Sequence, residues 1–150
     1  MWDLKDKKAL VTGGSKGIGK AVVSELLELG AEVIFTARDG KVVSQVVEEF
    51  KQQGHFVHGL MADVASVDHR FRVAKWIEEH WGKLDILVNN AGINIRKPSS
   101  DYLVEEYRNV LEIDLIAPFE FCRELRELLE KSGRASIVNV ASVAGLTDVQ

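Results

Sequence analysis

A glycine-rich turn near the N-terminus, set between a short apolar run and an amphipathic segment, is the strongest constraint on how this chain can fold. The apolar run covers residues 9–12, and residues 12–19 read T-G-G-S-K-G-I-G. Gly13 permits a tight turn, Gly17 lets the backbone approach a phosphate, and Gly19 lets the following helix pack closely on the strand. The first N–H groups of a helix are unpaired and carry the positive end of its dipole. The sequence therefore predicts a strand, turn and helix that hold a pyrophosphate.

Strand and helix patterns alternate along the rest of the chain. Apolar runs predict strands at 9–12, 32–36, 55–60, 84–88 and 136–141. Helical periodicity predicts helices at 18–29, 41–53, 67–81 (with Ser66 as the N-cap) and 103–131, the last with a break near 114–118. We expect the first helix to turn Ile18, Val22, Leu26 and Leu29 inward, and the third Phe71, Ala74, Ile77 and Trp81.

This alternation of nearly continuous apolar strands with helices predicts an α/β fold with a parallel sheet covered on both faces. Together with the glycine turn, it favours a doubly wound, Rossmann-type sheet that binds its ligand at the carboxyl ends of the strands. With 150 residues, of which 46% are apolar, the chain is long enough to form one domain with a core of its own. We therefore expect residues 1–150 to form a dinucleotide-binding domain with five strands.

Composition narrows the classes of function. The net charge of −4 gives no general attraction to nucleic acid or to an anionic membrane. No apolar run approaches the length of a membrane span and the N-terminus lacks a signal-peptide core, so we expect a cytoplasmic protein. Cys122 is the only cysteine and lies in an apolar helical pattern, typical of a small buried side chain. The four histidines do not have metal-ligand spacing, and no metal site is expected.

Two basic residues and one acidic residue help to predict whether the ligand is NAD or NADP. After the second strand, where an acid would accept from the ribose 2′-hydroxyl of NAD, the sequence has Arg38 followed by Asp39. Arg38, with Lys16 in the glycine turn, could instead pair with the 2′-phosphate of NADP. This favours NADP(H) over NAD(H), although Asp39 argues slightly against it. Asp63, after the third strand, is either an acceptor for the adenine amino group or a turn residue, and the sequence leaves both open.

The later motifs bear a resemblance to a known family. Residues 89–92 read N-N-A-G after the fourth strand, and residues 136–145 read S-I-V-N-V-A-S-V-A-G at the fifth. With the glycine turn, they closely resemble the short-chain dehydrogenase/reductase family over essentially the whole chain. Residues 92–98 (G-I-N-I-R-K-P) and 105–107 (E-E-Y) are most similar to its tropinone-reductase-like members.

The resemblance implies roles for particular residues. Ser142 corresponds to the serine that hydrogen-bonds the substrate carbonyl oxygen. Asp114 stands where the family has an asparagine that holds a water on the proton-relay path, and Pro118 has no N–H to donate to the Asp114 carbonyl, which we expect to be free for water. The cofactor-binding residues implied by the resemblance are Gly13, Ser15, Lys16, Gly17, Ile18, Gly19, Arg38, Asp63, Val64, Asn90, Ala91 and Gly92.

One part of the family pattern is absent from the chain. In the family, the Tyr-x-x-x-Lys motif supplies the general acid and the lysine that lowers its pKa, and here it would begin a few residues after Gln150. A sheet that ended at the fifth strand would also leave an unpaired, apolar edge. We expect the N-terminal part of a single-domain NADP(H)-dependent oxidoreductase, a homo-oligomer at full length, that interconverts a small-molecule carbonyl and a secondary alcohol. The alternatives are a truncated, non-catalytic nucleotide-binding fragment, a half completed by another chain, and a 3-oxoacyl-carrier reductase of the same family.

Overall fold

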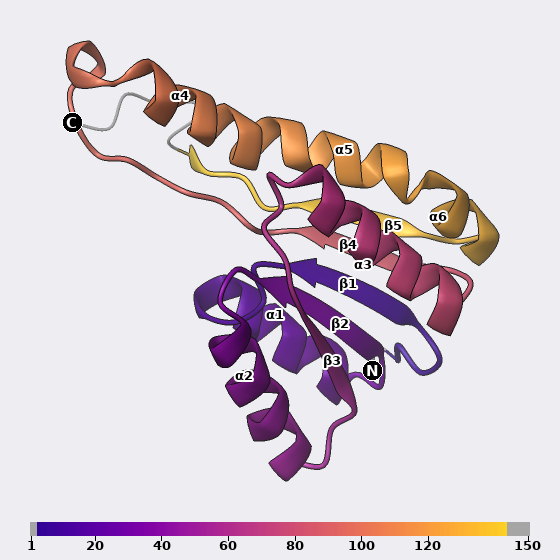
Figure 1. Cartoon of the computed structure of the whole chain (residues 1–150). Helices are drawn as coiled ribbons and strands as arrows, with labels where there is room; N and C mark the ends of the chain where they lie inside the picture. Colours follow the sequence, from indigo (N-terminus) through magenta and orange to yellow (C-terminus); the bar gives the residue numbers. More distant parts are fainter. Residues whose placement is uncertain (1–2, 144–150) are drawn as a thin grey trace.

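The structure, a computed structural model, describes residues 3–143 and contains a five-stranded parallel sheet (Figure 1). The strands are β1 (Lys8–Thr12), β2 (Glu32–Ala37), β3 (Val57–Met61), β4 (Ile86–Asn89) and β5 (Ser136–Asn139). The α-helices are α1 (Gly17–Glu28), α2 (Gly40–Gln52), α3 (Val67–His80), α4 (Val104–Leu111), α5 (Ala117–Glu124) and α6 (Arg126–Ser132). A 3-10 turn, η1 (Ser99–Asp101), precedes α4, and a π-helical turn, η2 (Glu112–Ile116), joins α4 to α5.

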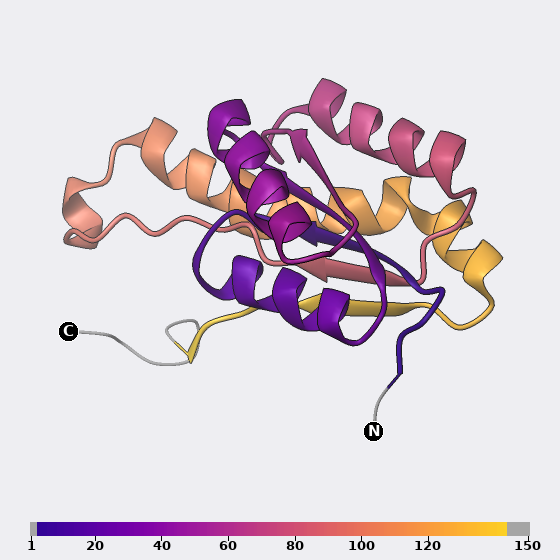
Figure 2. The same cartoon turned by 90° about the horizontal axis from the view of Figure 1, so that it is seen from below.

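The strand order is β3-β2-β1-β4-β5, so the chain winds outward from β1 in both directions. Because all neighbours are parallel, the carboxyl ends of the strands lie at one edge of the sheet, and the order reverses between β1 and β4. Helices α1 and α2 cover one face, whereas α3, α5 and α6 cover the other (Figures 1 and 2). The prediction of a doubly wound Rossmann-type sheet is confirmed.

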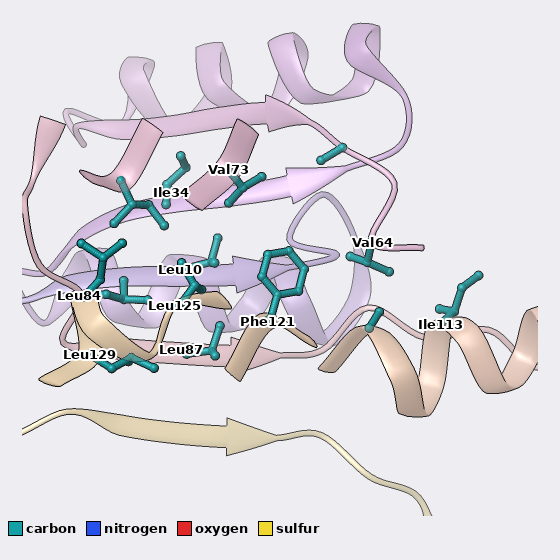
Figure 3. Close-up of a cluster of buried hydrophobic side chains, with 14 residues drawn as sticks. Leu10, Ile34, Val64, Val73, Leu84, Leu87, Ile113, Phe121, Leu125 and Leu129 are labelled. Carbon is teal, nitrogen blue, oxygen red and sulfur yellow. The ribbon is translucent and has the colours of Figure 1, made fainter. Parts of the chain in front are cut away.

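Each face of the sheet packs a separate apolar cluster. In the cluster drawn in Figure 3, Leu10, Ile34 and Leu87 of the sheet meet Val73 of α3 and Phe121 of α5. On the opposite face, alternate residues of the same strands meet α1 and α2 through Val23, Val43 and Phe50, among others. Strands buried on both faces account for the continuous apolar runs in the sequence.

The inward faces of two helices agree only in part with the prediction: Ile77 is buried and Val22, Leu26, Ala74 and Trp81 pack against the core, but Ile18 and Phe71 do not. In α1 the buried residues are Gly19, Val23 and Leu27, whereas Ile18 is 66% exposed. In α3 they are Arg70, Val73 and Ile77, and the side chain of Phe71 is exposed. The predicted close packing at Gly19 is confirmed, because a Cβ there would lie closer than 3.0 Å to the Gly13 carbonyl oxygen. The prediction considered apolar residues only, so it missed the arginine with buried partners on the inner face of α3.

The long helical segment after β4 bends in ways the sequence indicated only in part. The predicted break near 114–118 is the π-helical turn η2, where the Ala117 N–H donates to the Glu112 carbonyl five residues before it. The helix is interrupted again at Leu125, whose backbone angles (φ −93°, ψ 3°) separate α5 from α6. Cys122 is half-buried, not fully buried as expected, and packs against the core.

The sheet ends at β5, whose four residues are all exposed. The residues that follow Asn139 up to Val143 are exposed as well, and Ala144 and Gly145 of the predicted fifth-strand motif lie outside the described residues. This matches the expected unpaired edge. No helix within residues 3–143 combines the length and the apolar character needed to cross a bilayer.

At the amino ends of the strands, one buried carboxylate ties three elements together. Asp85 is 1% exposed and accepts from the Lys8 N–H (2.9 Å) and from the Ser132 hydroxyl (2.6 Å). Lys83 lies 3.2 Å away as a counter-ion. These contacts hold the start of β1 and the end of α6 to the start of β4.

Candidate functional site

A cleft of about 400 Å³ lies at the carboxyl ends of β1 to β4. Its walls come from four connections, which follow β1, β2, β3 and β4, and from Ile113 of η2. The cleft therefore lies at the point where the strand order reverses, which is where sheets of this type bind ligands. All twelve residues proposed to bind the cofactor line it: Gly13, Ser15, Lys16, Gly17, Ile18, Gly19, Arg38, Asp63, Val64, Asn90, Ala91 and Gly92.

The glycine turn has the conformation its sequence predicts. Gly13 and Gly17 have φ of +67° and +54°, which side-chain-bearing residues rarely adopt. Gly19 has no room for a side chain, because a Cβ there would lie closer than 3.0 Å to the Gly13 carbonyl oxygen and to the Asn90 amide nitrogen. The turn thus brings the start of α1 against the end of β1 at the floor of the cleft.

The start of α1 is open, unlike the starts of the next two helices. Asp39 caps α2 by accepting from the Lys41 and Val42 N–H groups, and Ser66 caps α3 by accepting from the His69 N–H. Lys16, the N-cap residue of α1, makes no such side-chain hydrogen bond. The first turn of α1 therefore offers its N–H groups and its dipole to the cleft, as an anion site requires.

Thr12 and Asn90 hold the turn to the end of β4. The Thr12 hydroxyl accepts from the N–H groups of Asn90 and Ala91, both at 3.0 Å. In return the Asn90 side-chain amide donates to the Thr12 carbonyl (3.0 Å) and the Gly13 carbonyl (3.2 Å). Asn90 thus lines the cleft while fixing the glycine turn. Thr12 was not among the predicted site residues, although a threonine just before the glycines was the available signal.

The basic residues lie as expected on the wall of the cleft. Arg38 and Lys16 both line it, and neither side chain has a hydrogen-bond or ion-pair partner in the part of the chain that the structure describes. Asp39, which argued against NADP(H), is turned to the start of α2 as its N-cap and does not line the cleft. Thr36 also lines the cleft, and its hydroxyl is buried with no partner among the described residues.

Asp63 has the turn role, one of the two that the sequence left open, and its role as an acceptor for adenine stays a prediction. One carboxylate oxygen, Oδ1, accepts from the Ala65 N–H at 3.0 Å and so stabilises the turn after β3. The residue also lines the cleft with Val64. The Asp63 N–H donates to Nδ1 of His69 at 2.8 Å, and Arg70 donates to the Val64 carbonyl at 2.7 Å. Neither His69 nor Arg70 was identified from the sequence.

The two residues proposed to be catalytic, Asp114 and Ser142, are not among the residues that line the cleft, although Asp114 adjoins that lining. Asp114, in η2, accepts from the Ile93 N–H at 2.9 Å and so connects the π-helical turn to the loop after β4. Whether its carbonyl is free for water stays a prediction, since only the bond from residue 118 is excluded, by Pro118. Ser142 is exposed three residues after the end of β5. Within residues 3–143, no group of three or more His, Cys, Asp or Glu residues could hold a metal ion.

Known proteins share both this sequence pattern and this fold. The family described as short chain dehydrogenase matches residues 7–150. The chain belongs to the short-chain dehydrogenase family. A tropinone reductase homolog from Arabidopsis thaliana is 40% identical over 146 residues, covering 97% of this chain and 55% of its own length. A tropinone reductase homolog from Datura stramonium is 37% identical over 149 residues, covering 99% and 56%. The resemblance predicted from the sequence is thereby confirmed.

A solved structure agrees with this assignment. The 7α-hydroxysteroid dehydrogenase complexed with NADH and 7-oxo glycochenodeoxycholic acid superposes with a TM-score of 0.92 at 28% identity, over 99% of this chain and 58% of that one. Short-chain dehydrogenases are oxidoreductases that bind a nicotinamide cofactor, act on small molecules and commonly form oligomers. This chain spans about half the length of the curated relatives it matches.

Proposed function

We propose that this chain forms the NADP(H)-binding part of an oxidoreductase that interconverts a carbonyl compound and a secondary alcohol by hydride transfer. The observation that carries the cofactor assignment is the pair of basic side chains, Arg38 and Lys16, on the wall of the cleft. The one nearby acid, Asp39, is used as a helix cap. A 2′-phosphate would find two cations there, whereas the 2′-hydroxyl of NAD(H) would lack its usual carboxylate acceptor.

The residues present fit a dinucleotide. The open start of α1 would bind the pyrophosphate, with Gly17 at the point of closest approach, where a Cβ would meet no atom within 4 Å. The buried Thr36 hydroxyl, which has no partner within residues 3–143, lies in the lining, where a bound polar group would satisfy it. Asp63 and Val64 would lie on the adenine side, and Ala91 and Gly92 on the ribose side. When bound, the nicotinamide ring would supply or accept the hydride.

The chain's own part in the chemistry is to orient the substrate. Ser142 would donate a hydrogen bond to the carbonyl oxygen and so stabilise negative charge that develops there. Asp114 would hold the loop after β4 through the Ile93 N–H and support the proton relay. In the family pattern, the tyrosine that donates the proton and the lysine beside it follow residue 150.

The setting of the reaction is part of the same proposal. The substrate would be a small-molecule ketone or alcohol. We propose a cytoplasmic protein that forms a homo-oligomer at full length and acts on neither nucleic acid nor membrane. The NADH-bound relative carries a ketone, 7-oxo glycochenodeoxycholic acid, beside its cofactor, which supports a carbonyl as the substrate class here.

The cofactor preference is tested by titrating the protein with NADPH and with NADH and following cofactor fluorescence. We expect tighter binding of NADPH, and we expect Arg38→Asp to weaken NADPH binding by about tenfold or more while leaving NADH binding unchanged or tighter. Arg126→Asp is the matched control, because Arg126 lies on α6, pairs with Glu130 and does not line the cleft. Equal loss in both variants, or no preference for NADPH, would refute the role of Arg38. Failure of both cofactors to bind would refute the assignment as a whole.

A further inference from the structure

The loop between β3 and α3 is held in place by two successive residues of α3. Nδ1 of His69 accepts from the Asp63 N–H at 2.8 Å, and Nη1 of Arg70 donates to the Val64 carbonyl at 2.7 Å. Asp63 and Val64 both line the cleft. The side chains of His69 and Arg70 therefore fix the peptide groups on either side of the point where the loop faces the ligand.

The bond to His69 specifies the protonation state of the ring. A backbone N–H can only donate, so Nδ1 must present a lone pair, and the neutral ring must carry its proton on Nε2. Histidine side chains as a class gain a second proton between pH 8 and pH 5. A doubly protonated ring would turn an N–H toward the Asp63 N–H, and two donors cannot share a hydrogen bond.

We propose that His69 is a positioning residue for the adenine side of the cleft, and that cofactor binding weakens as the pH falls because the protonated ring releases the Asp63 N–H. This inference rests on the proposed function, since it needs a nucleotide in the cleft. Guanidinium groups as a class do not lose their proton in this range, so the bond from Arg70 keeps the Val64 carbonyl in place while the Asp63 side of the loop is released.

The charges around His69 do not supply an alternative partner for a protonated ring. Within residues 3–143, no carboxylate oxygen lies within 4 Å of either ring nitrogen. Glu124 of α5, the helix packed against α3, pairs with Arg70, and one oxygen of Asp63 accepts from Ala65. The other charged and titratable groups of the loop, of α3 itself and of the elements packed on it are Asp63 of the loop, Asp68, Arg70, Arg72, Lys75, Glu78, Glu79 and His80 of α3, His58 of β3, and Glu120, Cys122, Arg123 and Glu124 of α5.

The variant His69→Asn keeps a hydrogen-bond acceptor at residue 69 but removes the ring that can gain a proton. The Oδ1 atom of asparagine is as many bonds from Cα as Nδ1 of histidine and is an acceptor that gains no proton in this range. The assay is calorimetric titration with NADP⁺ at pH 8 and at pH 5.5. Between these two pH values, the affinity of the unmodified chain should fall by about fivefold more than that of the variant. This is the loss expected for one neutral hydrogen bond. Protonation of the 2′-phosphate of NADP⁺ affects both proteins equally and cancels in the comparison.

The matched control is His80→Asn on the same helix. Its Nδ1 lies 2.8 Å from the Trp76 carbonyl, outside the cleft, so this variant should keep the full pH dependence. As a readout independent of binding, the NMR signal of the Asp63 amide should shift as the pH is lowered from 8 to 5.5 in the unmodified chain and lose that response in His69→Asn.

The inference is overturned if His69→Asn shows the same pH dependence of binding as the unmodified chain, or if the NMR signal of the Asp63 amide does not shift between pH 8 and pH 5.5. If NADP⁺ binds at no pH, the proposed cofactor is wrong. The NMR titration then still decides whether His69 holds the loop.

Discussion

Among the glycines of residues 3–143, Gly19 is the one where an added Cβ would come closest to a neighbouring atom. A Cβ there would lie closer than 3.0 Å to the carbonyl oxygen of Gly13 and to the amide nitrogen of Asn90. Carbon atoms in proteins normally keep about 3.5–4.0 Å from such neighbours. Because the first of the two is backbone, the clash in a Gly19→Ala variant is relieved only by moving the glycine turn or the start of α1.

The expected size of the effect follows from three opposing contributions. Overpacking a tight contact costs about 1–3 kcal/mol. Displacing the Asn90 amide weakens its bonds to the Thr12 and Gly13 carbonyls, each of which contributes about 1 kcal/mol. Alanine is favoured over glycine inside a helix by about 1 kcal/mol, which offsets part of the loss. We therefore expect the free energy of unfolding to fall by about 2 kcal/mol.

The measurement is urea unfolding followed by circular dichroism, with Gly40→Ala as the control. Gly40 is the first residue of α2, and a Cβ there would meet Met61 at 3.6 Å, an ordinary contact. That variant should keep or slightly raise the free energy of unfolding, by at most about 1 kcal/mol. If Gly19→Ala has the same free energy of unfolding as Gly40→Ala, the close approach of α1 to the glycine turn does not require a glycine at position 19.

Two further predictions concern buried charges. Burial opposes the charge of Asp85, but its hydrogen bonds from Ser132 and from the Lys8 N–H outweigh this and hold its pKa below the ordinary 3.8. The stability it contributes is therefore complete above about pH 4 and is lost as the pH falls through that lowered pKa. Asp85→Asn should unfold more easily at neutral pH, by about 2 kcal/mol, and show a weaker loss of stability in acid titrations followed by fluorescence. Arg70 is 3% exposed and pairs with Glu124. Arg70→Leu should lower the free energy of unfolding in urea by about 3–5 kcal/mol, since Glu124 would lose its counter-ion. An additional Glu124→Leu change should recover part of that loss, and a double variant no more stable than the single one would contradict the pairing.

The parts of the structure that were predictable from sequence are those written into consecutive residues. The turn at residues 12–19 needs glycine at fixed positions because its backbone has positive φ at Gly13 and Gly17. The strands are apolar throughout because helices cover both faces of the sheet. Each such requirement falls on neighbouring residues, so the order of elements and the edge that carries the cleft both follow from one sequence.

The missed features depend on contacts between distant segments. Nothing in the sequence around residue 90 says that its amide bonds the carbonyls of Thr12 and Gly13, 78 and 77 residues away. The inner face of α3 includes an arginine because a carbonyl and Glu124 both lie within its reach, and periodicity of apolar residues cannot indicate that. In the sequence, His69 has no mark beyond that of an ordinary surface or half-buried residue, because its role is set by the direction of one N–H group in the preceding loop.

The N-termini of three helices lie at the carboxyl edge of the sheet, but only one of the three is suited to bind a pyrophosphate. Helices α1, α2 and α3 all begin at the carboxyl edge, so all three direct positive dipole ends toward it. At α2 a carboxylate, Asp39, already occupies the first N–H groups, and at α3 the Ser66 hydroxyl does. Only α1, among these three, begins without a side-chain cap. An anion in the cleft therefore gains most there, and the side chain of Asp39, being engaged at α2, leaves Arg38 as the charge that a ligand would meet after β2.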